Sequence, residues 1–360
     1  MNVKFFFSAA VTFRSYEYLR KMPNYVPLNM LHTQYERKHI EHAMPYIDSG
    51  EFGKLFIDSG AYSVHTGKQK ENIEEYVDYL NKIDDYTEVV AQFDQIPGKY
   101  HVPKMPEDYV YSAEKTWDNF LWMYNGLKSP QKLAWVFHQG EHPDNLKRSL
   151  EWKDKDGNGV GIIGLSGQGD SSEKMIRTWV TEMMQVVRNS KRPRTKVHLF
   201  GMASEVTIGR AVDLLETVGM EVISDSTTHV QLGAFGKILT PIFHQPVIVS
   251  GRQMPMNPES VKLLKDAGLD IEDKKFDFDS EDVKIALNGK SLYLEMLPYK
   301  GGDEMYDRLK KYIESLNITI EELQTTSYVR TAVNMYYLQH VFDKITQAQE
   351  SKVLTSRKLF

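Results

Sequence analysis

The feature of this sequence that most restricts its fold is the regular alternation of short apolar runs with amphipathic helical patterns. Most of the runs are rich in β-branched or aromatic residues and apolar throughout, which is typical of strands buried on both faces of a parallel sheet. The expected strands are Val3–Ala9, Leu55–Asp58, Val89–Asp94, Leu133–His138, Gly161–Leu165, Val197–Gly201 and Val222–Asp225.

Amphipathic helices are expected between these strands. Apolar residues share one helical face in 73–83, in 175–187 and in 208–215, and Gly219 stands where the last of these helices should end. Successive strands begin roughly 25–40 residues apart, which is the spacing of βα units. About seven or eight such units predict an α/β fold, a TIM-like (β/α)8 barrel rather than an open sheet.

The pattern changes after residue 240. We therefore expect a barrel core in 1–240, and a region 241–360 that completes the barrel and adds an α-rich C-terminal appendage. Asn257-Pro258-Glu259 has the residue types that begin a helix, and two further helices are expected near the end of the chain.

Composition excludes several kinds of site. The chain of 360 residues contains no cysteine, so it has no disulfide, no thiolate nucleophile and no cysteine-ligated zinc subdomain. This agrees with a cytoplasmic protein. No run approaches the ~18 apolar residues of a membrane span, and the formal net charge of −5 argues mildly against a nucleic-acid partner.

Polar residues collect where the expected strands end. In a (β/α)8 barrel these ends form one face, on which active sites lie. The segments are Asp58-Ser59-Gly60-Ala61-Tyr62, Phe93-Asp94-Gln95, His138-Gln139-Gly140, Gly164 to Asp170, Phe200-Gly201-Met202 and Ser224-Asp225-Ser226. We expect their aspartates to converge on one polar pocket.

These segments also resemble those of the tRNA-guanine transglycosylases, in the same order and with similar spacing. The resemblance covers roughly residues 50–235. The residues that carry it are 57–62, 93–94, 136–140, 163–170, 199–203 and 223–226, which are similar to the family's D-S-G-G-[FY]-Q, F-D, V-Q-G, I-G-G-L-x-x-G-E, L-M-G-x-G and F-D-C segments.

The resemblance implies two catalytic residues. Asp225 matches the family's nucleophile, and Asp58 matches its general acid/base. Exchange of a base at C1′ with retention requires two displacements, as in retaining glycosidases, and a second carboxyl group that carries the proton between the two bases. This chemistry needs no metal and no redox cofactor.

Six further residues match base-binding positions of the family. Two of them read the edge of a guanine-like base, two contribute backbone groups to it, and two sandwich its ring. In that order they are Asp94 and Gln139, Gly164 and Leu165, and Tyr62 and Phe200.

The chain departs from the family in two features that serve tRNA docking. It lacks the cysteine-rich zinc cluster, and residues 225–233 lack the basic P-T-R and N-G-R-N-G pattern that follows the nucleophile. In both respects it resembles the phage-type (DpdA-like) DNA-guanine transglycosylases. The implied partners are DNA and a free 7-deazaguanine base such as preQ0, with tRNA less favoured and with helper proteins or a second copy left open.

Two clusters of basic residues are candidate phosphate contacts, although such clusters more often face water as ordinary surface. The second cluster spans residues 14–38 and has interleaved tyrosines. The first, which we assign to nucleic-acid binding, is Arg188, Lys191, Arg192, Arg194 and Lys196.

Other interpretations of the same residues remain open. An aspartate at a strand end is often only a helix cap or turn former. The His138-x-x-x-His142 pair crosses a strand end, which does not favour a metal site. At the level of function, the alternatives are a tRNA-guanine transglycosylase, a non-catalytic nucleic-acid-binding partner subunit, and an unrelated barrel hydrolase with paired carboxylates.

Overall fold

The structure is a computed structural model that describes residues 3–8, 12–167, 171–190, 196–216, 220–243, 245–250, 256–273, 276–278, 280–290, 292 and 303–357. Contacts between Cα atoms divide the chain into two compact units. The first comprises residues 1–10, 27–227 and 339–360, and the second comprises residues 11–26 and 228–338.

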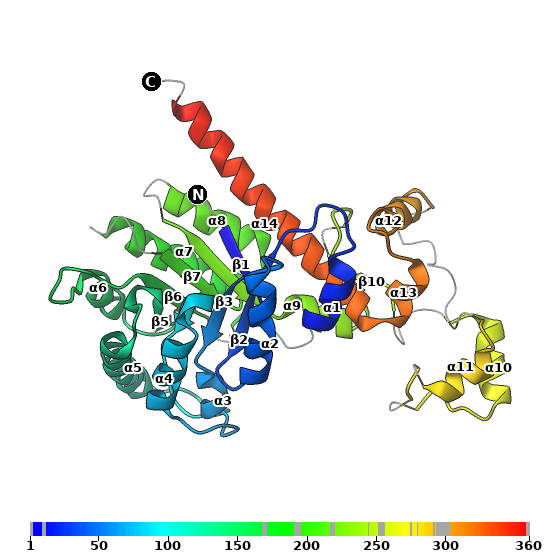
Figure 1. Ribbon diagram of the computed structural model, residues 1–360, viewed down its shortest axis with the longest axis horizontal. Coiled ribbons are helices and arrows are strands. Elements are labelled where there is room, and N and C mark those ends of the chain that lie inside the picture. Colours follow the sequence, from blue (N-terminus) through cyan, green and yellow to red (C-terminus); the bar gives the residue numbers. More distant parts are fainter. Residues whose placement is uncertain are drawn as a thin grey trace. The chain divides into compact units, whose positions relative to one another are not determined.

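The first unit is a closed barrel of eight parallel strands in sequential order, which confirms the predicted (β/α)8 fold (Figure 1). The barrel closes where β1 pairs with β8, with Val3 opposite Val222 and Phe7 opposite Ser226. The strands are β1 (Val3–Ser8), β2 (Leu28–Thr33), β3 (Phe52–Asp58), β4 (Thr87–Ala91), β5 (Leu133–His138), β6 (Ile162–Ser166), β7 (Lys196–Phe200) and β8 (Val222–Ser226).

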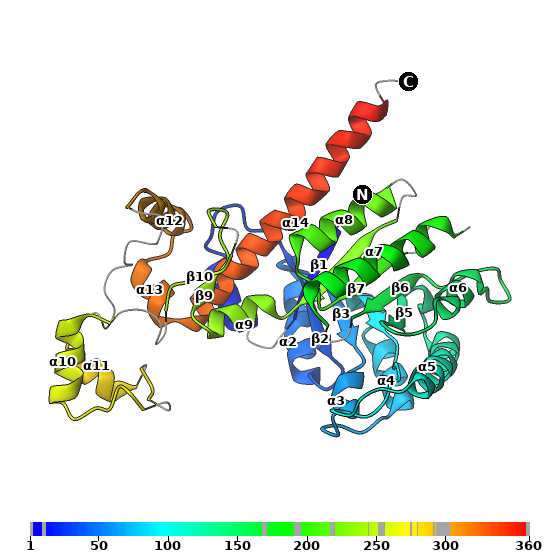
Figure 2. The same ribbon diagram turned by 180° about the vertical axis from the view of Figure 1, so that it is seen from behind.

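Helices that connect these strands surround the barrel (Figure 1). Side-chain caps fix where several of them begin, as at Asn72, whose side chain accepts from the backbone N–H of Glu75. Neighbouring helices α7 and α8 pack side by side (Figure 2). The helices of the barrel unit are α2 (Arg37–Asp48), α3 (Ala61–His65), α4 (Ile73–Lys82), α5 (Pro106–Gly126), α6 (Pro143–Glu151), α7 (Glu173–Asn189) and α8 (Glu205–Glu216), with short 3-10 turns η1 (Asp84–Tyr86) and η2 (Pro130–Lys132). Gly219, the expected end of α8, lies outside the described residues.

The barrel strand that sequence patterning missed is β2. It pairs with β1 and β3 and completes the barrel, so no strand after residue 241 is needed for closure. Leu28, Met30 and Leu31 are buried, but Asn29 and His32 interrupt the apolar run. The side-chain oxygen of Asn29 accepts from the backbone N–H of Lys54 on β3, so a polar residue is accommodated within the strand.

The second unit is mainly helical, as expected for the C-terminal region. Its strands β9 (Lys237–Ile238) and β10 (Val247–Ile248) form a small antiparallel sheet. Its helices are α1 (Thr12–Leu19), α9 (Thr228–Ala234), α10 (Pro258–Asp266), α11 (Glu281–Leu287), α12 (Asp303–Ser315), α13 (Ile320–Thr325) and the first part of α14 (Ser327–Arg357). The boundary of the compact units after Thr227 differs from the expected boundary at 240/241.

Buried hydrogen bonds hold the second unit together. The Arg330 guanidinium donates to the backbone oxygens of Gly233, Leu323 and Gln324. Asn257 caps α10 by accepting from the backbone N–H of Glu259, as its position before Pro258 predicts. Helix α14 continues into the barrel unit, where Phe342 stacks on Phe5 of β1 with ring centroids 4.4 Å apart.

The interior of the barrel has an apolar layer below a polar one. Alternate strand residues point inward, and the apolar layer consists of Phe6, Leu31, Phe56, Val89, Ala91, Ala134, Ile162 and Ile223. Two residues further along four of these strands, on the same face, lie Ser8, Asp58, Gly164 and Asp225. The polar groups therefore stand on a hydrophobic floor at the carboxyl ends of the strands. None of the described helices combines the length and the apolarity that crossing a bilayer requires.

Candidate active site

A cavity of about 880 Å³ opens at the carboxyl ends of the barrel strands. This size is within the range of small-molecule sites. Its lining comes from the ends of β3, β5, β6 and β7, from α3, and from the loop between β4 and α5. It comprises Asp58, Ala61, Tyr62, His65, Asp94, Ile96, Pro97, Lys99, Tyr100, His101, Val102, Pro103, Lys104, Val136, His138, Gln139, Ser166, Gly167 and Phe200.

The pKa of Asp58, the last residue of β3, is higher than that of an ordinary aspartate. Its burial raises its pKa, and the negative charge of Asp94 adds to the effect. The backbone N–H of Gly60 donates to Oδ2 of Asp58 at 3.1 Å and opposes the shift, while the charge of Asp225 reinforces it. The net result is a pKa of about 7, so Asp58 can both hold and release a proton near neutral pH.

A chain of buried side chains runs from Asp94 through His138 to Glu141. Nε2 of His138 lies 2.8 Å from Oδ2 of Asp94, and Nδ1 lies 2.7 Å from Oε1 of Glu141. Burial by itself lowers the pKa of His138, but the hydrogen bonds and the charges of both acids outweigh it and raise the pKa to about 9. His138 is therefore an imidazolium at neutral pH, with both ring nitrogens donating.

Sequence reasoning found Asp94 but missed the roles of His138 and Glu141. Asp94 lies three residues beyond the end of β4, in the loop rather than in the strand. The signal in the sequence was the spacing of three residues between His138 and Glu141 across the turn at Gly140, which lets the glutamate fold back onto the imidazole.

Asp225 in β8 is held by three donors. Oδ1 lies 2.8 Å from Nε2 of His198 and accepts from the backbone N–H of Gly201 at 3.1 Å. Oδ2 lies 3.4 Å from the hydroxyl of Ser8, which donates to it. These contacts fix the orientation of the carboxylate, and 12% of its side-chain surface remains exposed. Asp225 is near enough to Asp58 for its charge to affect that residue, but it is not among the described residues that line the cavity.

The Phe200 ring leaves no room for a side chain at residue 164, which explains the glycine there. A Cβ at residue 164 would lie only 2.4 Å from Cε2 of Phe200, so a side chain there would push the ring away from its place in the cavity wall. Leu165 is fully buried and, as the next residue of β6, its side chain points out of the barrel toward the helices. Only its backbone is available on the cavity side.

Tyr62 and Gln139 both line the cavity. Tyr62 lies on α3 at the rim, where 58% of its surface is exposed, and its ring meets that of Tyr100 edge-on. The backbone N–H of Gln139 donates to the carbonyl oxygen of Ser166, which joins the loop after β5 to the end of β6. Tyr62 and Phe200 thus both line the cavity, Tyr62 from α3 and Phe200 from the end of β7.

Of the predicted nucleic-acid contact set, the structure describes only Arg188 and Lys196, and neither lines this cavity. Lys196 is the first residue of β7, and its ammonium group pairs with Glu221 at 2.8 Å and lies 3.8 Å from Glu88. These residues lie at the amino ends of the strands, opposite the cavity. Arg188 is exposed in the last turn of α7, and Lys191, Arg192 and Arg194 lie outside the described residues.

The histidine pair at 138 and 142 does not form a shared site. His138 contacts Asp94 and Glu141, whereas His142 caps α6 and lies 3.4 Å from an oxygen of Asp144. Across the described residues, no group of three or more His, Asp or Glu side chains has the arrangement of a metal site.

No protein-family model matches this chain, and no curated protein matches it either. The chemistry of the site must therefore be inferred from its own geometry.

Proposed function

We propose that this protein is a DNA-guanine transglycosylase, which exchanges guanine in DNA for a 7-deazaguanine such as preQ0. The observation that carries the proposal is the meeting of Asp58, Asp94, His138 and Phe200 around one cavity, with the carboxylate of Asp225 close enough to influence Asp58. An acid that holds its proton near neutral pH, beside a second carboxylate held in place by donors, is the pair that base exchange at a sugar carbon requires.

Base recognition would depend on Asp94. The edge of guanine presents an N1–H and an amino group, and both need acceptors once the base is out of the stack. Oδ2 of Asp94 accepts a hydrogen bond from Nε2 of His138, while no hydrogen bond to Oδ1 occurs among the described residues. The positive charge of His138 holds the carboxylate in place, so that Oδ1 can accept from the base. Phe200 and Tyr62 supply ring faces for stacking.

The exchange proceeds in two displacements. In the first, an oxygen of Asp225 forms a bond to C1′ while the bond from C1′ to the guanine nitrogen breaks, and Asp58 gives its proton to the leaving base. In the second, the incoming 7-deazaguanine gives a proton to Asp58, its nitrogen bonds to C1′, and the ester to Asp225 breaks. Both carboxyl groups are then restored.

The two aspartates are suited to different steps by their surroundings. Asp58 has the raised pKa of an acid/base, whereas Asp225 is surrounded by the donors His198, Gly201 N–H and Ser8. Water is the competing nucleophile for the ester, so a base stacked in the cavity must also exclude water.

The test is incubation of the protein with DNA and labelled guanine or preQ0, with tRNA in a parallel reaction. Incorporation into DNA, together with a denaturation-stable protein–DNA adduct that Asp225→Ala abolishes, is the expected result. The control variant Asp78→Asn, at an exposed residue of α4, should still incorporate the base and form the adduct.

Three other results would contradict the proposal. Incorporation into tRNA alone would make RNA the substrate. Binding of nucleic acid without an adduct or exchange would identify a non-catalytic partner subunit. Release of the base without exchange would identify a hydrolase with paired carboxylates.

A further inference from the structure

The rim of the cavity differs in charge from its inner part. The inner part of the cavity contains the acidic groups Asp58 and Asp94, whereas Lys99 and Lys104, further along the loop between β4 and α5, lie at the rim. Lys99 is exposed and Lys104 is half-buried, and neither side chain forms an ion pair or hydrogen bond with the described residues. Two cations that no described side chain or backbone group pairs with are thus placed at the entrance of an acidic pocket.

Aromatic rings lie beside these cations. The Tyr100 ring meets that of Tyr62 at 6.2 Å and that of His65 at 6.1 Å, both edge-on, and its centroid is 3.8 Å from that of His101. Tyr62 and Tyr100 keep 58% and 43% of their surface exposed. Large aromatic surfaces left open to water beside a pocket mark a binding surface.

The loop that carries these groups is fixed in shape. Gly98 has a φ of 73°, a left-handed conformation that glycine adopts without strain, and the stem of Lys104 and the carboxylate of Asp108 pack over it. Asp108 also accepts from the backbone N–H of Met105 at 2.8 Å, which holds the loop where α5 begins. Burial lowers the pKa of His65, and the positive charge of Lys104 is near enough to lower it further.

We propose that this rim, defined as Tyr62, His65, Lys99, Tyr100 and Lys104, binds a single nucleic-acid strand on both sides of the target nucleotide. Lys99 and Lys104 would contact backbone phosphates, and the base next to the extruded one would stack on Tyr100. The inference rests on the proposed function and assigns its nucleic-acid contacts to the loop after β4, in place of the basic cluster at residues 188–196.

An unpaired strand fits this surface better than a duplex. Stacking on an open tyrosine ring requires a base whose face is exposed, and cations that track a backbone beside aromatic rings are typical of proteins that bind single strands. The formal net charge of −5 makes the rest of the surface unfavourable to a polyanion, so local cations have to supply the attraction.

The test measures binding of a fluorescein-labelled, guanine-containing single-stranded DNA by fluorescence anisotropy at several salt concentrations. The variant Lys99→Ala/Lys104→Ala should weaken binding at least tenfold. It should also reduce the slope of log K against log salt by about 1.4, since each lost phosphate contact on a single strand contributes about 0.7.

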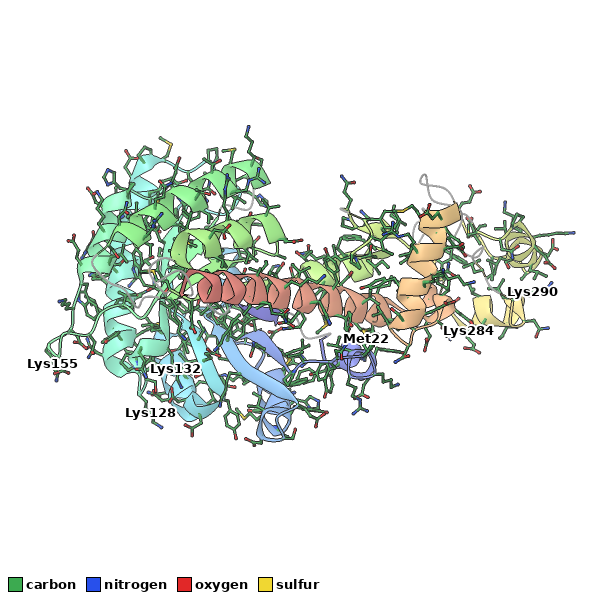
Figure 3. All side chains as sticks on the ribbon, turned by 90° about the horizontal axis from the view of Figure 1, so that it is seen from above. Met22, Lys128, Lys132, Lys155, Lys284 and Lys290 are labelled. Atoms are coloured by element: carbon green, nitrogen blue, oxygen red, sulfur yellow. The ribbon has the colours of Figure 1, made fainter. Side chains whose placement is uncertain are left out.

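A matched control removes two lysines from the opposite end of the barrel. Lys128 and Lys155 lie in segments that lead into β5 and β6, on the outer surface of the barrel unit (Figure 3). The variant Lys128→Ala/Lys155→Ala loses the same charge and should keep the affinity and the salt slope of the wild type. Thermal unfolding of each variant checks that the fold is intact.

The outcomes separate this inference from the proposed function. If the wild type exchanges bases but the rim variant keeps its affinity and salt slope, or if both double variants weaken binding equally, the rim assignment is overturned and the exchange chemistry stands. A rim variant that loses affinity for guanosine monophosphate but not for the DNA strand would also overturn it, in favour of a free nucleotide. A wild type that neither binds nor modifies any nucleic acid refutes both.

Discussion

Replacement of Asp58 by asparagine should stabilise the barrel unit, and the gain in stability should increase with pH. The pKa of Asp58 is raised from 3.8 to about 7 by burial and by the charge of Asp94. Because the folded-state pKa lies above that of the unfolded chain, the contribution of Asp58 to the stability of the wild type is fully present in acid and is lost as the pH rises from about 4 through about 7. Asparagine does not titrate and escapes this loss.

The magnitude follows from about 1.4 kcal/mol for each pKa unit. At pH 8 the carboxyl group is ionised in both states, and the rise of its pKa from 3.8 to about 7 costs about 4 kcal/mol. At pH 5 it is ionised only in the unfolded chain, and the cost is about 1.5 kcal/mol. The difference in unfolding free energy between Asp58→Asn and wild type should therefore grow by about 2.5 kcal/mol between these pH values.

Tryptophan fluorescence in urea titrations measures this difference in the barrel unit. The chain has five tryptophans, and all of them belong to that unit: Trp117, Trp122, Trp135, Trp152 and Trp179. His138 also titrates, with a raised pKa whose stabilisation is lost as the pH rises toward about 9, but both proteins share this effect and subtraction removes it. The exposed Asp78→Asn is the control. If the curves of Asp58→Asn and wild type run parallel from pH 5 to 8, the buried acid/base assignment is refuted.

Two further substitutions test the site. His138→Gln removes the cation between Asp94 and Glu141 and should destabilise the barrel by about 3 kcal/mol, because it leaves buried carboxylates without a counter-charge. In the same urea titrations, the double variant His138→Gln/Glu141→Gln should recover part of this loss. No recovery would contradict the coupling between His138 and Glu141. Gly164→Ala places a methyl group 2.4 Å from the Phe200 ring and should weaken binding of free guanine at least tenfold in calorimetry, whereas Phe200→Leu in the same chain should restore part of it. Unchanged guanine affinity in Gly164→Ala would show that the ring does not shape the base site.

The barrel could be predicted from sequence because a parallel strand buried on both faces leaves an almost continuous apolar run. The expected runs coincide with β1 and with β3 to β8 within a few residues. β2 escaped because Asn29 and His32 interrupt its run, and the hydrogen bond that satisfies Asn29 comes from Lys54 on the neighbouring strand. A partner on another strand cannot be seen in the local pattern.

The same limit applies to the site. Asp58, Asp94 and Gln139 could be placed at the cavity because each lies at or just beyond the end of a strand, and the ends of parallel strands meet on one face. His198 could not be assigned to Asp225, since this pair joins residues 27 positions apart. Lys196 could have been judged better from the sequence alone, because a residue that begins a strand lies at the end of the barrel opposite the active site.

The charges around the cavity suit a neutral base in its inner part and a phosphate group at its rim. A neutral base can enter the cavity, where Asp58 keeps its proton below about pH 7 and His138 offsets part of the negative charge of Asp94 and Glu141. A phosphate group brought to the same depth would face these carboxylates in a partly dehydrated site, where repulsion is stronger than in water. At the rim the same phosphate meets Lys99 and Lys104. Since base and backbone are joined by one sugar, in the proposed reaction this gradient would hold C1′ between the rim and the inner part of the cavity, near Asp58 at the end of β3 and Asp225 in β8.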